Sequence, residues 1–242
     1  MPPTEVSLDP SVSALLAAVT AWLSFTLLRI WSRSELAHWL SAEQADLALS
    51  APSLWRIAAF LLAGGEVLLL SVLQGDWPSL AVAFALGGLT GALTLAAMID
   101  LRCQLLPDRI TWLVIGLGLI AALLGLSVSF GEALLGGLIG YGLPWLLTLL
   151  GRRRHRKRAA IEGQMAVPMG RGDFALIAGL GVWLGFSSLP LVLVLACLAM
   201  LPFVVWGMFR HGWQLATALP FGPALAFAGL ALLPWTDFGF IG

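Results

Sequence analysis

MGRGDFALIAGLGVWLG, residues 169–185, is the stretch on which the interpretation of this chain depends. Asp173 follows a Gly-Arg-Gly turn and directly opens an apolar run. A charged group at the mouth of a membrane segment is costly and indicates a functional site. A second stretch, AAMIDLRCQLLPDRITW (residues 96–112), places Asp100 at the end of one apolar run and Asp108 at the start of the next. We therefore expect a membrane protein organised around aspartates at the membrane edge.

The composition is that of an integral membrane protein. Of the 242 residues 60% are hydrophobic and only 11% are charged, and the mean hydropathy is +0.94. A soluble domain is about a quarter charged. Apolar runs of about 18 or more residues recur along the chain, which predicts an all-α, polytopic membrane bundle. The formal net charge of zero provides no overall field to attract nucleic acid.

About eight transmembrane helices are expected. The segments are residues 12–31, 54–73, 79–99, 110–129, 132–150, 173–189, 190–209 and 219–236. The breaks between them carry turn residues, as in Gln74–Pro78. We treat residues 1–242 as one membrane domain, with the first span and a short cytoplasmic loop over 12–53 and the core over 54–236.

The basic residues predict the orientation. Acidic residues precede the first span and arginines follow it, which argues against a signal peptide and places the N-terminus outside. All thirteen Lys and Arg residues then fall in or beside four inside regions, residues 29–56, 100–109, 151–172 and 210–218. This threading places Asp100, Asp108 and Asp173 together at the cytoplasmic face.

Asp100 and Asp173 are the candidates for chemistry. Two carboxylates brought close together in a low-dielectric site cannot both ionise, so one keeps a proton. An aspartic protease uses that split: the charged acid takes a proton from water and the neutral acid donates one to the scissile carbonyl. The alternative is two independent helix-end carboxylates that face lipid headgroups. For Asp108, which follows Pro107, we expect a capping role at the start of a helix.

Other polar residues have structural explanations beside functional ones. Glu66 lies mid-span, and function and an interhelical polar contact are both open for it. The basic run at 151–158 is expected to anchor the topology on anionic lipid. Cys103 and Cys197 cannot form a four-thiolate zinc site and are expected to be small packing residues. The three histidines show no ligand spacing.

Taken together, these residues resemble the type IV prepilin peptidase family, whose members are Gly-x-Gly-Asp intramembrane aspartic proteases. The family pattern pairs an aspartate before Leu-Pro-Asp with a later Gly-x-Gly-Asp. The matching positions are Asp100, Leu106-Pro107-Asp108, Gly170-Arg171-Gly172-Asp173 and Leu219-Pro220-Phe221-Gly222-Pro223. Glu66 resembles an acid of the second span in the family. The resemblance covers roughly residues 54–236.

The resemblance implies an endopeptidase in the bacterial inner membrane that uses Asp100 and Asp173 at the cytoplasmic face. It would remove short basic leaders from type IV prepilins or type II secretion pseudopilins, after a glycine that precedes the substrate's hydrophobic helix. Asp108 matches a position where relatives also accept asparagine. The implied partners are these substrates and membrane lipids, and nucleic acid is not expected.

The sequence departs from the family pattern in three places. Arg171 stands where an aromatic residue is common, and the interval between the two aspartates is longer than expected. The excess lies in the basic run and in Ala159–Val167. Bifunctional members carry a four-cysteine zinc module after the first span and also methylate the product, whereas Ser32–Ser53 is short and lacks cysteine. Zinc, S-adenosylmethionine and methyltransferase activity are therefore not expected.

Two other functions compete with the peptidase. A proton- or ion-coupled transporter would use intramembrane acids as a relay and would show a repeated half. Only Glu66 lies near a midplane, and the sequence shows no repeat. A catalytically silent assembly subunit would not need both Asp100 and Asp173.

Overall fold

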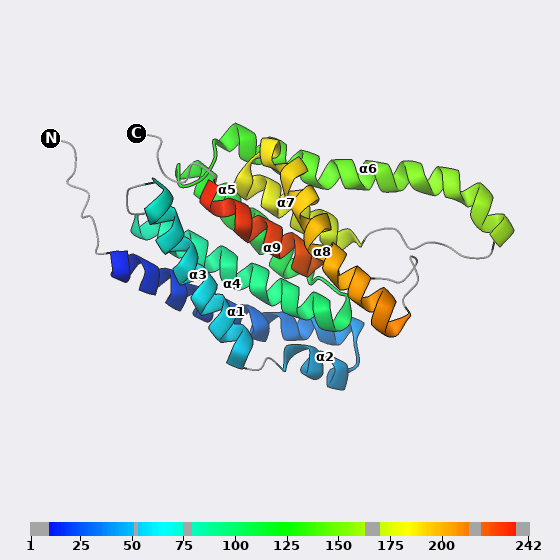
Figure 1. Cartoon of the computed structure of the whole chain (residues 1–242), viewed down its shortest axis with the longest axis horizontal. Coiled ribbons are helices and arrows are strands. Elements are labelled where there is room, and N and C mark those ends of the chain that lie inside the picture. Colours follow the sequence, from blue (N-terminus) through cyan, green and yellow to red (C-terminus); the bar gives the residue numbers. More distant parts are fainter. Residues whose placement is uncertain (1–9, 51–52, 75–78, 163–169, 213–218, 236–242) are drawn as a thin grey trace.

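The computed structural model describes residues 10–50, 53–74, 79–162, 170–212 and 219–235. Within these ranges the protein is helical, with no strand (Figure 1). The helices are α1 (Pro10–Trp39), α2 (Ala42–Leu49), α3 (Ser53–Gln74), α4 (Leu80–Cys103), α5 (Asp108–Leu123), α6 (Phe130–Glu162), α7 (Arg171–Leu184), α8 (Leu189–His211) and α9 (Gly222–Leu232), with short 3-10 helices η1 (Phe186–Ser188) and η2 (Leu233–Trp235). The all-α prediction is confirmed.

Each of the eight expected segments contains a helix, but their lengths differ. By length and composition, five helices of the described ranges can cross a membrane, namely Ser11–Trp39, Ser53–Val72, Leu80–Cys103, Phe130–Leu150 and Phe186–Arg210. Helices α5, α7 and α9 have 16, 14 and 11 residues. At about 1.5 Å per residue they are shorter than a hydrocarbon core of about 30 Å. The protein is a multi-pass bundle in which short helices lie among long ones.

Helix α4 lies at the centre of the bundle. Its side chains are buried along almost the whole helix, and it packs against α1, α3 and α9. Helices α5, α6 and α7 form a second group, in which the buried Trp183 ring of α7 donates from Nε1 to the Val114 carbonyl of α5 at 2.9 Å. Helix α9 contacts α4, α7 and α8 and so connects the two groups (Figure 1).

Two predicted loops are wholly or partly helical. The expected loop after the first span consists mostly of the end of α1, which continues to Trp39, and of α2. The basic run at 151–158 lies within α6, which extends to Glu162 instead of ending near residue 150. The predicted turn at Gln74–Pro78 and the stretch Ala159–Val167 fall largely outside the described residues.

Candidate active site

Asp100 lies in the last turns of α4 and is almost fully buried. Its side chain is held from a distant part of the chain, since Oδ2 accepts a hydrogen bond from the backbone N–H of Gly222 at 2.8 Å. Helix α4 then ends at Gln104, whose positive φ of 52° and N–H bond to the Asp100 carbonyl close the helix. The carboxylate is therefore fixed by its own helix and by the start of α9.

Gly222 is the first residue of α9, where backbone N–H groups have no partner within the helix. The next residue is proline, which suits the first turn of a helix. A Cβ atom at position 222 would lie 2.8 Å from Asp100 Oδ2 and 3.1 Å from its Cγ. Only glycine allows this close approach. The Pro-Phe-Gly-Pro motif thus contributes a backbone donor to Asp100, a role that the sequence analysis did not predict.

Asp173 occupies the third position of α7, behind Gly170 as the N-cap residue. The backbone N–H of Gly170 faces the Asp173 carboxylate and favours its charged form. The charge of Asp100 acts on Asp173, so the two carboxylates are within electrostatic reach of each other. The two aspartates that the sequence analysis paired therefore lie within electrostatic range of each other, and their catalytic roles stay a prediction.

Leu106 and Gly172 bring the two aspartate motifs into direct contact. A Cβ atom at Gly172 would lie 2.6 Å from the Leu106 Cβ and 3.2 Å from the Leu106 carbonyl oxygen. The second glycine of Gly-x-Gly-Asp therefore lets the Leu-Pro-Asp loop pack against the start of α7. Sequence spacing alone gave no indication of this contact.

The capping role predicted for Asp108 is wrong. Its side chain makes no capping hydrogen bond, because Pro107 occupies the N-cap position and Asp108 is the first helical residue of α5. Its own N–H instead donates to Oε1 of Glu35, at 2.8 Å. Asp108 is exposed and still lies in the first turn, where the helix dipole favours an acid. Glu35 was not identified from the sequence, in which no motif marks it.

Glu66 is buried in α3 and faces α4. Its Oε2 accepts a hydrogen bond from the Thr90 hydroxyl at 2.8 Å. Thr90 precedes Asp100 by almost three turns of α4, which corresponds to about 15 Å. Of the two roles left open for Glu66, this geometry supports an interhelical polar contact, and Glu66 lies apart from the aspartate pair.

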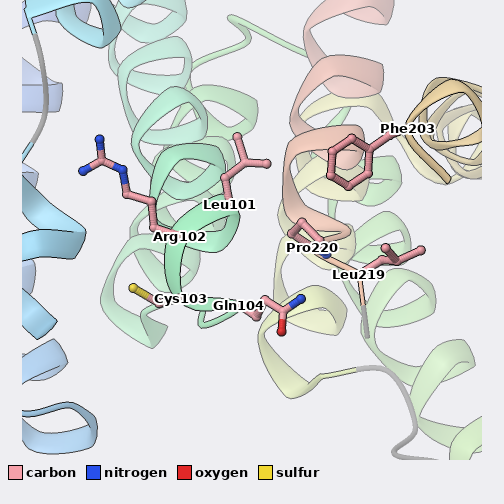
Figure 2. Close-up of a pocket in the computed structure, with 7 residues that line it drawn as sticks. All are labelled: Leu101, Arg102, Cys103, Gln104, Phe203, Leu219 and Pro220. Atoms are coloured by element: carbon pink, nitrogen blue, oxygen red, sulfur yellow. The ribbon is translucent and has the colours of Figure 1, made fainter. Parts of the chain in front are cut away.

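A cavity of about 350 Å³ opens beside Asp100, between the end of α4, helix α8 and the residues just before α9 (Figure 2). It is lined by Leu101, Arg102, Cys103, Gln104, Phe203, Leu219 and Pro220. In Figure 2 the Arg102 side chain points away from Phe203 and Pro220. Its Nη1 donates to the carbonyls of Leu47 and Ser50 at 3.0 and 2.9 Å, at the end of α2. The lining is mixed: Leu101, Phe203 and Leu219 contribute apolar side chains, and Gln104 contributes a polar one.

Metal ligands are not grouped in the part of the chain that the structure describes, where no three His, Cys, Asp or Glu residues could hold an ion. The prediction that the reaction needs no zinc stays a prediction.

The fold and this site define a multi-pass membrane protein with two interacting helix-end carboxylates beside an open cavity. Comparison with known families adds the class of enzyme. Residues 87–205, which include both aspartates, match the family model described as the type IV leader peptidase family. This part of the chain belongs to that family, as the motifs predicted, and the protein therefore carries a peptidase-family domain.

Curated relatives agree with the family match. The chain is 34% identical over 194 residues to a protein of Aeromonas salmonicida (strain A449) named prepilin leader peptidase/N-methyltransferase. The aligned region covers 80% of this chain and 61% of the relative. Proteins of the same name from Xanthomonas campestris and Pseudomonas aeruginosa are each 38% identical and cover 57% and 62% of this chain. The matches cover 45% and 48% of those two relatives. The chain therefore matches about half to three fifths of the relatives' length, and no solved structure matches it.

Proposed function

We propose that this protein is an aspartic endopeptidase that removes the leader from type IV prepilins or type II secretion pseudopilins at the cytoplasmic face of the bacterial inner membrane. The observation that carries the proposal is the electrostatic interaction between Asp100, which accepts from the Gly222 N–H, and Asp173, within a leader-peptidase family domain. The substrate class rests on the printed names of the relatives.

In the proposed reaction the two carboxylates hold one proton between them, as an interacting acidic pair does. The ionised member takes a proton from water, and the water oxygen adds to the carbonyl carbon of the scissile peptide bond. The protonated member donates its proton to the carbonyl oxygen. In the collapse of the tetrahedral intermediate the C–N bond breaks, the protonated member gives its proton to the leaving nitrogen, and a hydroxyl proton of the intermediate passes to the ionised member, which restores the shared proton.

The cavity beside Asp100 supports an approach path for the substrate. It opens where α4 ends and includes Pro220, two residues before the N–H group that holds Asp100. We propose that the scissile segment enters through this cavity, with the apolar helix of the substrate beside the bundle. Leu101 and Phe203 provide apolar contacts on this path.

The location of Glu66 argues against an ion-coupled transporter. A relay requires acids close enough to pass a proton. Glu66 contacts Thr90, about 15 Å along α4 from Asp100, and so does not extend the aspartate pair into a chain.

The test is cleavage of a model prepilin by the purified protein in lipid vesicles, read as a mobility shift. Asp100→Asn and Asp173→Asn keep the size of each side chain but remove the shared proton, so each should lower cleavage by several orders of magnitude. Asp108→Asn, whose side chain caps nothing, should retain most activity. Normal cleavage by either of the first two variants would refute the proposal, and an inserted but inactive Asp108→Asn would mean that the wrong carboxylates were paired.

A further inference from the structure

We propose that Glu35 is a positioning residue for the candidate active site. Its carboxylate, at the end of α1, holds the first turn of α5 and thereby fixes the contact between Leu106 and Gly172 beside Asp173. The inference rests on the proposed endopeptidase function, and its test separates the two.

Glu35 provides the cap that α5 lacks. The first N–H groups of a helix have no partner within it, and Pro107 offers no side chain that could accept from them. Glu35 accepts from the Asp108 N–H through Oε1 at 2.8 Å and from the Arg109 N–H through Oε2 at 3.4 Å. A carboxylate is the acceptor that the positive end of the helix dipole favours. The start of α5 is therefore held by a residue more than seventy positions upstream.

Arg109 restrains Glu35 and ties α5 to the same turn of α1. Its Nε lies 3.7 Å from Glu35 Oε2, and only 15% of the Glu35 side chain is exposed. Its Nη1 donates to the Trp31 carbonyl at 3.0 Å and to the Ser34 hydroxyl at 2.8 Å. The guanidinium also lies 5.3 Å from the centre of the Trp31 ring, within cation–π range. These contacts leave the Glu35 carboxylate little freedom to move.

The first turn of α5, which Glu35 holds, is directly connected to the aspartate pair. Leu106 precedes the held residues by two positions and packs against Gly172, next to Asp173. On its other side, the short link from Gln104 leads back to α4 and Asp100. A shift of the first turn of α5 therefore changes the position of Leu106, and with it the spacing between the two carboxylates.

The first experiment measures kcat and KM for leader cleavage by Glu35→Ala and Glu35→Gln. Glu35→Ala should lower kcat by about 10- to 100-fold, since a misplacement of about 1 Å has an effect of that size. KM should change little, because Glu35 does not line the cavity beside Asp100. Glu35→Gln keeps an acceptor oxygen and should recover most of the lost kcat. An unchanged kcat in Glu35→Ala, or a loss that appears only in KM, would overturn the inference.

Asp46→Asn is the matched control. Asp46 lies on α2, and its carboxylate pairs with Arg33 at 2.9 Å, but both side chains are more than half exposed. Exposed pairs contribute little, so this variant should cleave as the unaltered protein does. If Glu35→Ala fails to insert, Glu35→Asp withdraws the carboxylate by one methylene group and tests the same contact.

The second experiment needs no prepilin. Leu106→Cys, in a background with Cys103→Ser and Cys197→Ser, is labelled by a maleimide in membranes. Adding Glu35→Ala should accelerate labelling several-fold, and adding Asp46→Asn should not. Unchanged labelling in Glu35→Ala overturns the positioning role whatever the cleavage result. A protein whose labelling depends on Glu35 but that never cleaves a prepilin overturns the proposed function instead.

Discussion

Replacing Gly222 by alanine tests how Asp100 is held without altering either carboxylate. The added Cβ would lie 2.8 Å from Asp100 Oδ2 and 3.1 Å from its Cβ. Non-bonded atoms need about 3.5 Å, so the carboxylate or the start of α9 has to move by roughly half an ångström or more. The 2.8 Å hydrogen bond from the Gly222 N–H is then stretched or lost.

The size of the effect follows from that bond. A hydrogen bond to a charged group contributes about 1.5–3 kcal/mol, and about 1.4 kcal/mol corresponds to a tenfold change in rate. We therefore expect Gly222→Ala to lower kcat for leader cleavage by about 10- to 100-fold if the loss falls on the transition state.

The assay is initial-rate cleavage of a model prepilin in vesicles, with membrane insertion checked by immunoblot. Gly116→Ala in α5 is the control, since a Cβ atom there meets nothing within 4 Å and it should cleave normally. If Gly222→Ala cleaved at the unaltered rate, the contact between α9 and Asp100 would not matter for activity and this reasoning would be refuted.

Further predictions concern the interhelical contact, the topology and the cofactors. Thr90→Val removes the hydrogen-bond donor to Glu66 and should lower the free energy of unfolding by about 0.6–1.7 kcal/mol; an unchanged melting temperature in detergent would contradict this. Reporter fusions after residues 45 and 212 should indicate the inside of the membrane, and fusions after residues 76 and 130 the outside, because the Lys and Arg residues lie in or beside the predicted inside regions. An inside result at residue 130 would contradict the predicted order of inside and outside loops. Cleavage should persist in a chelator, and the product should not gain a methyl group from S-adenosylmethionine; restoration of a chelated enzyme by zinc, or stoichiometric methylation, would show these two expectations to be wrong.

The family and the pair of aspartates could be predicted from the sequence because their signals are local. Hydropathy over about twenty residues marks each helix, and a carboxylate at the end of an apolar run stands out against it. The motifs around Asp100 and Asp173 are short and contiguous, so they could be identified without knowledge of any contact. The orientation of α4, α5 and α7 in the membrane stays a prediction, which rests on the alternation of the spans and on the basic residues.

Residues that contact one another across the bundle could not be predicted in this way. Asp108 was expected to cap α5, but Glu35 does so instead. Which residue accepts from the first N–H groups of α5 depends on where the end of α1 lies relative to α5. Glu66 could have been functional until its partner Thr90 was known.

The sequence by itself determined that the chain is a helical membrane protein with acids at helix ends, since the cost of burying polar groups acts on each segment separately. The tertiary structure decided which N–H group holds Asp100 and that Leu106 packs on Gly172. Such contacts depend on the rotation and spacing of neighbouring helices. These are set by the packing of side chains that are far apart in the sequence, and no local pattern records them.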